Sequence, residues 1–124
     1  MLRCGIDMIE NQRIADGVER FGERFLRRFF TAGERADCAD QPRRLAARFA
    51  AKEAVAKALG TGIGAVKWVE IEIRVNNADC RPTLHLHGAA ARLAADLGLT
   101  QWDVSLTHTD RYASAVVVAL GGPG

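Results

Sequence analysis

An alanine-rich run from Arg48 to Leu59 contains no helix-breaking residue, and glycines follow it at positions 60, 62 and 64. Such a run predicts a helix that ends at Gly60, after which the glycines free the backbone for close contacts. Glu53 and Lys57 are four residues apart, so they share one side of this helix among small alanines. That side leaves room for a ligand to reach a carboxylate and an amine. The simpler interpretation is an exposed Glu–Lys pair worth about 0.2–0.5 kcal/mol.

Composition narrows the class of protein. The 124 residues suffice for one domain, and apolar and charged contents of 48% and 26% are ordinary for a soluble globular chain. The net charge of +2 argues against a general nucleic-acid binder, and no apolar run reaches the ~18 residues of a membrane helix. The first residues do not resemble a signal peptide, and three scattered cysteines indicate neither a zinc site nor a disulfide framework. We therefore expect a single domain, residues 1–124, in the reducing cytoplasm.

Apolar periodicity, capping residues and turn residues predict the order strand, three helices, two strands, helix, two strands. Helices are expected over 12–30, 32–38, 42–59 and 89–97. Strands are expected over 2–10, 66–75, 82–87, 102–108 and 112–120, with a turn at 76–79 between the second and third. This order predicts an α+β fold, in which helices pack on one face of a largely antiparallel sheet.

The predicted first helix separates apolar from basic side chains. Its apolar stripe contains Ile14, Val18, Phe21, Phe25 and Phe29. Its other side carries a basic group that we call the docking arginines: Arg13, Arg20, Arg24 and Arg27. Basic residues on an exposed helix face are usually only solvated, but this segregation also suits a docking surface for an acidic partner.

Two carboxylates and a lysine suggest phosphate chemistry. Asp is depleted in strands, so Asp7 in the predicted first strand either caps a neighbouring group or points into a site. Asp7 and Glu53 are hard oxygen ligands suited to Mg²⁺, which proteins hold by one or two carboxylates together with substrate phosphates. The glycines after Lys57 could offer backbone N–H groups to phosphate. Their spacing is not a Walker motif, because no Gly-Lys-Ser/Thr ends it and it follows a helix.

These motifs resemble those of the holo-(acyl-carrier-protein) synthase family, the small 4′-phosphopantetheinyl transferases. Residues 5–10, Gly-Ile-Asp-Met-Ile-Glu, are similar to the family's opening motif, and residues 48–64 are similar to its central signature. Later blocks match in order at 68–73, at Arg81-Pro82 and at 104–109. The similarity extends over nearly the whole chain, with Cys80 standing where a glycine is common.

The resemblance implies transfer of 4′-phosphopantetheine from coenzyme A to a serine of an apo acyl carrier protein, which yields adenosine 3′,5′-bisphosphate. The carrier would serve fatty-acid, polyketide or peptide synthesis. Asp7 and Glu53 would hold Mg²⁺, or Mn²⁺ in its place. Glu53 and Lys57 would be the catalytic residues. Glu53 or a metal-polarised water would accept the serine proton, and Lys57 would neutralise phosphate or protonate the leaving oxygen.

The resemblance also implies binding surfaces. Coenzyme A would contact Arg43, Arg44, Arg48, Lys57, Gly60, Thr61, Gly62, Ile63, Pro82, His108 and Thr109. The docking arginines would meet the acidic helix of the carrier protein. The family forms a homotrimer with active sites between protomers, so we expect that assembly, without nucleic-acid or membrane partners. The alternatives are a non-catalytic carrier-binding module, which the intact acidic residues and lysine disfavour, and an RNA-binding domain, which an aromatic content of 6% disfavours.

Overall fold

The computed structural model describes residues 1–75 and 78–122, and over these residues its elements follow the predicted order with two additional helices, at 23–29 and 68–70. The α+β prediction is confirmed. The helices are α1 (Asn11–Phe21), α2 (Glu23–Phe29), α3 (Ala32–Cys38), α4 (Pro42–Leu59), the short 3₁₀ helix η1 (Trp68–Glu70) and α5 (Gly88–Asp96). The strands are β1 (Leu2–Glu10), β2 (Ile71–Val75), β3 (Pro82–Leu86), β4 (Leu99–His108) and β5 (Tyr112–Gly121). In the described ranges no helix is long and apolar enough to span a bilayer.

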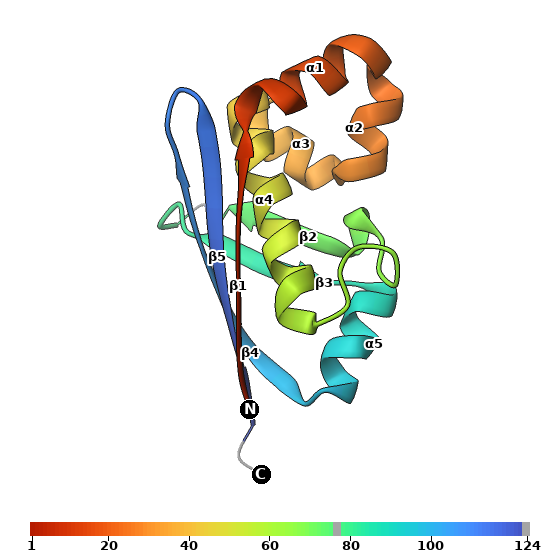
Figure 1. Cartoon of the computed structure of the whole chain (residues 1–124), viewed down its shortest axis with the longest axis vertical. Helices are drawn as coiled ribbons and strands as arrows, with labels where there is room; N and C mark the ends of the chain where they lie inside the picture. Colours follow the sequence, from red (N-terminus) through yellow and green to blue (C-terminus); the bar gives the residue numbers. More distant parts are fainter. Residues whose placement is uncertain (76–77, 123–124) are drawn as a thin grey trace.

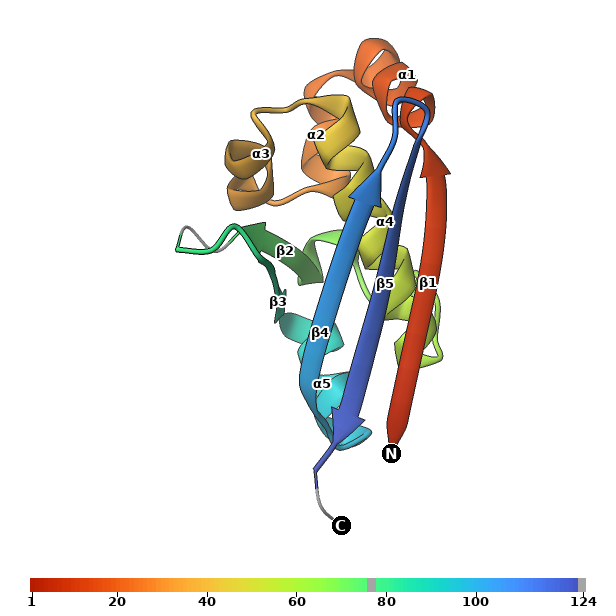
Figure 2. The same cartoon turned by 90° about the vertical axis from the view of Figure 1, so that its left-hand side faces the viewer.

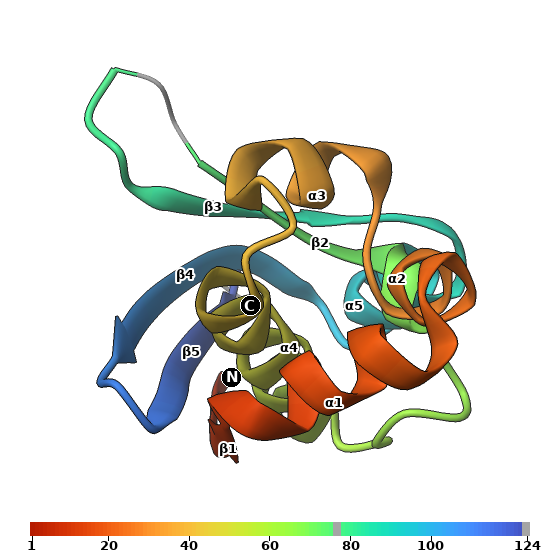
Figure 3. The same cartoon turned by 90° about the horizontal axis from the view of Figure 1, so that it is seen from above.

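The strands form two antiparallel sheets rather than one. A three-stranded sheet has the order β1-β5-β4, and β2 pairs with β3 in a separate two-stranded sheet (Figure 1). Seen from above, α4 lies between the two sheets (Figure 3). Of its 18 residues, 12 are buried, because small alanines let strands approach from both sides. In its last three turns, only Phe49, Glu53 and Lys57 are not buried, so the side predicted to admit a ligand is the one left accessible.

The single helix predicted over 12–30 is wrong. The chain breaks at Gly22, whose φ of 56° lies in the left-handed region that favours glycine, and α2 then folds back against α1. The packing is close: a Cβ at Gly17 would lie 2.2 Å from the Phe25 ring. Phe21, predicted to belong to the apolar stripe of the helix, is 54% exposed at this corner.

The strand predicted over 66–75 is also shorter than expected. Residues 68–70 form η1, and the strand begins only at Ile71. The Glu70 carboxylate explains the difference, since it accepts hydrogen bonds from the backbone N–H groups of Lys67 and Ala89 and so holds the chain in a turn. The turn predicted at 76–79 falls partly outside the described residues, because 76 and 77 are not among them.

A fully buried ion pair and its hydrogen bonds connect α3, α4, η1 and β2 in the core. Lys52 of α4 donates to the Glu34 carboxylate of α3 at 2.7 Å, and its other two protons go to the carbonyls of Trp68 and Ile71 at 3.0 and 2.6 Å. Glu34 also accepts from the backbone N–H groups of Thr31 and Ile73. Burial lowers the pKa of the Lys52 amine, and the Glu34 charge opposes that shift. Every donor of the amine is thus satisfied.

One face of the three-stranded sheet is apolar and uncovered. Figure 2 looks onto this face, with the helices behind it. We call it the open sheet face. Alternate residues of the outer strand β1 and of the central strand β5 point outward from it, and each of the following is more than 40% exposed: Leu2, Ile6, Met8, Val116, Val118 and Leu120.

Candidate active site

Asp7 and Lys57 lie beside each other where β1 passes along α4. The Lys57 amine is 3.2 Å from Asp7 Oδ1 and also donates to the Ile6 carbonyl at 2.9 Å. Alternation along β1 directs Asp7 toward α4 and sends Ile6 to the opposite face. Glu53 lies one helical turn before Lys57 on the same side of α4. The strand carboxylate, the helix carboxylate and the lysine therefore converge as predicted.

The surroundings of the Glu53 carboxyl disfavour its negative charge. Partial burial raises its pKa, the negative charge of Asp7 raises it further, and Lys57 opposes both effects. Among the described residues no donor forms a hydrogen bond to Glu53, whereas Asp7 has Lys57. Two neighbouring carboxylates, of which one is partly desolvated and lacks a hydrogen bond, form a site that a cation would stabilise.

The donor set fits Mg²⁺ better than a soft metal. It consists of two carboxylates, and the described part of the chain contains no group of three or more His, Cys, Asp or Glu side chains arranged around one point. Zinc sites normally use three or four such ligands, whereas Mg²⁺ is typically held by one or two carboxylates and by substrate phosphate oxygens. Asp7 and Glu53 therefore suit a cation that arrives with a phosphorylated substrate.

The glycines after Lys57 were predicted to offer backbone N–H groups to phosphate, but several of these groups are occupied in the structure. Gly60, with φ of 79°, ends the helix, and the N–H groups of residues 60, 61 and 62 bond to the carbonyls of Lys57 and Ala56. These donors therefore cap a helix C-terminus, whose partial negative charge does not attract phosphate. The side chains of Thr61, Lys57 and Arg3 lie at this end of the helix and could contact phosphate instead.

The predicted coenzyme A residues form groups at opposite ends of α4. Lys57 and residues 60–63 lie at its C-terminal end. Arg43 lies at its N-terminal end, where it pairs with Asp110 at 3.1 Å in the β4–β5 turn, which contains Thr109 and directly follows His108. A cavity of about 420 Å³ opens beside Arg43 and Asp110. The two ends are about 24 Å apart along the helix axis.

The other predicted coenzyme A residues, Pro82, Arg44 and Arg48, differ in location and in exposure. Pro82 starts β3 and borders a cavity of about 460 Å³ next to β4 and β5, in a third location. Arg44 is exposed, but Arg48 is buried and donates to the Arg44 carbonyl at 3.3 Å. Within the described part of the chain its Nε has no hydrogen-bond partner, so a buried guanidinium N–H remains available at this position.

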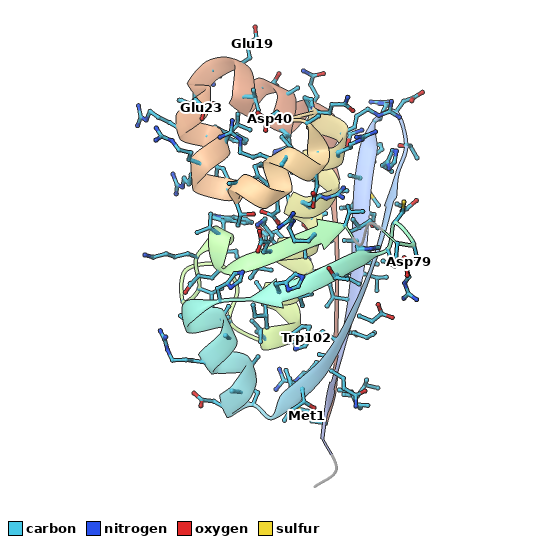
Figure 4. The ribbon with its side chains drawn as sticks, turned by 180° about the vertical axis from the view of Figure 1, so that it is seen from behind. Met1, Glu19, Glu23, Asp40, Asp79 and Trp102 are labelled. Carbon is cyan, nitrogen blue, oxygen red and sulfur yellow. The ribbon has the colours of Figure 1, made fainter. Side chains whose placement is uncertain are left out.

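The docking arginines are all exposed, but two belong to α1 and two to α2. Glu23, which interrupts the basic group, is held by Arg35 through two bonds of 2.8 and 2.9 Å, and Arg35 also pairs with Asp40 (Glu23 and Asp40 are labelled in Figure 4). Beside them lies a shallow apolar groove of about 340 Å³, lined by Phe21, Arg24, Phe25, Arg28 and Phe29. This corner combines cations with exposed aromatic surface.

Comparison with known proteins identifies the family of the chain. A model of the 4′-phosphopantetheinyl transferase superfamily matches residues 3–117, a span that includes Asp7, Glu53 and Lys57. The chain belongs to this superfamily. A superfamily relative from Herpetosiphon aurantiacus, named holo-[acyl-carrier-protein] synthase, is 48% identical over 98% of this chain and 100% of its own length. A protein of the same name from Solidesulfovibrio magneticus is 49% identical, covering 94% of this chain and 96% of the relative.

Solved structures within the superfamily show the same fold. Holo-[acyl-carrier-protein] synthase from Helicobacter pylori in complex with coenzyme A superimposes with a TM-score of 0.85 at 32% identity, covering 94% of this chain and 99% of that one. The Bacillus anthracis protein in complex with CoA (3′,5′-ADP) gives a TM-score of 0.77 at 31% identity, covering 97% and 96%.

Two residues that contact elements of the candidate site, Arg3 and Asn11, were not predicted from the sequence. Arg3 shares the inward face of β1 with Asp7 and donates to the Ala58 carbonyl at 3.2 Å, which places a cation at the end of α4. Asn11 is buried, and its Nδ2 donates to the carbonyls of Thr109 and Asp110 at 3.0 and 3.2 Å, which fixes the turn after His108. The alternation of β1 contained a signal for Arg3, whereas nothing in the local sequence indicated the contacts of Asn11.

Proposed function

We propose that the chain transfers 4′-phosphopantetheine from coenzyme A to a serine hydroxyl of an apo acyl carrier protein. The serine oxygen forms a bond to the phosphorus next to pantetheine, the bond to the bridging oxygen breaks, and adenosine 3′,5′-bisphosphate leaves. The observation that carries the proposal is the convergence of Asp7, Glu53 and Lys57 between β1 and α4 in a member of this superfamily. Phosphoryl transfer needs mainly charge neutralisation and positioning, and these side chains supply both.

We assign the Mg²⁺ ligands to Asp7 and Glu53, with Mn²⁺ as an acceptable substitute. The ion would supply charge neutralisation on the diphosphate oxygens. The Glu53 carboxylate is also positioned to accept the serine proton, whether directly or through water. Lys57, half exposed, would stabilise the departing phosphate oxygen and could return a proton to it.

The active site would be completed by a second copy of the chain in a homotrimer. The two groups of coenzyme A residues lie at opposite ends of α4 in one copy, so one ligand would meet both only between copies. The open sheet face offers the contact surface, because monomers rarely expose so many neighbouring apolar side chains.

Charging the open sheet face should separate the copies. We expect Ile6→Lys to turn the trimer into a monomer and to reduce transfer at least about 100-fold, because a buried lysine would face apolar partners. Light scattering after size exclusion measures the mass. Ala95→Lys, on the exposed side of α5, is the matched control and should stay trimeric. A monomeric wild type, or a trimeric Ile6→Lys, would contradict the assembly.

The carrier protein would dock on α1 and α2, through the docking arginines and the groove beside them. Charge reversal in Arg13→Glu with Arg20→Glu should raise the carrier KM roughly 10–100-fold and leave the coenzyme A KM within about twofold, since such contacts act on association. The effect should shrink with added salt. Arg92→Glu on α5, at the other end of the molecule in Figure 1, is the control. Equal changes in both KM values would contradict this docking site.

One assay tests the proposed reaction. The chain is incubated with coenzyme A, Mg²⁺ and an apo carrier protein, and the carrier is weighed by mass spectrometry. We expect a mass gain of one phosphopantetheine arm that a chelator abolishes. Binding of the carrier without any mass gain would instead identify a non-catalytic carrier-binding module.

A further inference from the structure

Gly5 is the point where β1 comes closest to α4. It is buried in the middle of the strand and shares the inward face with Asp7, two residues on. Its backbone is not left-handed, so conformational freedom does not require a glycine here. Steric space does: a Cβ at Gly5 would lie 1.9 Å from the carbonyl oxygen of Ala54 and 2.8 Å from its carbon.

These neighbouring atoms cannot move aside as a side chain could. They belong to the backbone of α4, in the residue directly after Glu53. Any side chain at position 5 would therefore push strand and helix apart by more than about 1 Å before reaching an ordinary contact distance. The displacement would fall between Asp7 on one element and Glu53 on the other.

Two further contacts hold β1 against α4, along a contact that we call the seam. The Arg3 guanidinium donates to the Ala58 carbonyl at 3.2 Å, and the Lys57 amine donates to the Ile6 carbonyl at 2.9 Å. Residues 3–7 of β1 are thus fastened along residues 54–58 of α4, and Gly5 sets how closely they can approach.

We propose that Gly5 is a positioning residue that sets the separation of the Asp7 and Glu53 carboxylates and thereby the affinity of the cation site. This inference rests on the proposed function, because it takes the two carboxylates as the ligands. Mg²⁺ and similar ions demand a nearly ideal ligand geometry, so a shift of this size costs affinity even when both ligands are present.

Mn²⁺ binding, followed by the loss of its free-ion electron paramagnetic resonance signal, tests the inference without turnover. Coenzyme A is present and carrier protein is absent. We expect Gly5→Ala to weaken Mn²⁺ binding at least about 10-fold, the range found when groups that orient metal ligands are altered. Gly17→Ala is the matched control, since its Cβ would meet the Phe25 ring at 2.2 Å and not the backbone of α4. It should lower the melting temperature but leave the Mn²⁺ dissociation constant within about twofold.

The outcomes separate this inference from the proposed function. If wild type binds Mn²⁺ in a manner lost in Asp7→Asn, and Gly5→Ala binds as tightly as wild type, the inference is wrong and the metal assignment stands. If Asp7→Asn binds Mn²⁺ as tightly as wild type, both are wrong. Should Gly5→Ala fail to fold, Arg3→Ala loosens the seam without a clash. We expect it to weaken binding about threefold, and unchanged binding would overturn the role of the seam.

Discussion

Glu53→Gln and Asp7→Asn should each reduce phosphopantetheine transfer roughly 10³-fold or more while the protein stays folded. Each substitution keeps the shape of the side chain but removes a charge that would hold the cation and, at Glu53, accept the serine proton. Transfer is measured by carrier mass and folding by circular dichroism. Asp96→Asn, which removes an exposed carboxylate from α5, should leave transfer unchanged. Retained activity in both site variants would reject the metal assignment.

The same substitution at Glu53 should stabilise the protein in chelator. The folded-state pKa of Glu53 is raised by burial and by Asp7, so its ionised form is less favourable in the folded state than in the unfolded one. The folded state therefore holds its proton longer, and stability falls as pH rises through that raised pKa. Glu53→Gln should melt a few degrees higher than wild type at pH 7.5, with the difference vanishing at pH 4 and below. A variant that melts lower at pH 7.5 would contradict the repulsion from Asp7.

Lys52→Met should cost roughly 3–5 kcal/mol of unfolding free energy, enough to unfold a marginal domain. The substitution leaves the Glu34 carboxylate buried without its cation, the Ile71 carbonyl loses its bond from Lys52, and the Trp68 carbonyl keeps only the Ile71 N–H as donor. Urea unfolding measures the loss. Arg81→Met breaks the exposed pair with Asp103 at 3.5 Å and should cost less than about 1 kcal/mol.

A double variant distinguishes the causes of that loss. Lys52→Met with Glu34→Gln removes the uncompensated charge, so it should be more stable than Lys52→Met alone, although the Ile71 carbonyl still lacks its donor from Lys52. A double variant as unstable as the sum of the single variants would mean that the pair contributes no coupling. In that case the hydrogen bonds from Lys52 to the carbonyls would carry the whole effect.

Local patterns predicted the parts of the structure that neighbouring residues determine. Pro42 begins α4, Thr31 and Glu34 form a capping box, and Gly60 ends the central helix in a left-handed conformation. Asp7, Glu53 and Lys57 were expected to converge because hard ligands and a lysine suit phosphate chemistry, and the structure brings them together.

The structure differs from the sequence-based prediction where residues distant in the sequence determine the local conformation. Gly22 ends α1 because Phe25 can pack on Gly17, a contact that helical periodicity does not reveal. From the sequence, Lys52 resembles a surface residue of the helix. In the structure, α3 and β2 cover it and bury it completely. The division of the strands into two sheets depends on α4 lying between them, and the separation of the coenzyme A residues depends on the length of that helix.

The most direct test is a crystal of the chain grown with coenzyme A and Mn²⁺, in which anomalous scattering locates the ion. We predict a peak between the side-chain oxygens of Asp7 and Glu53, against the diphosphate, with His108 and Thr109 of an adjoining copy on the same ligand. A coenzyme A molecule bound elsewhere, with no ion near either carboxylate, would contradict the account.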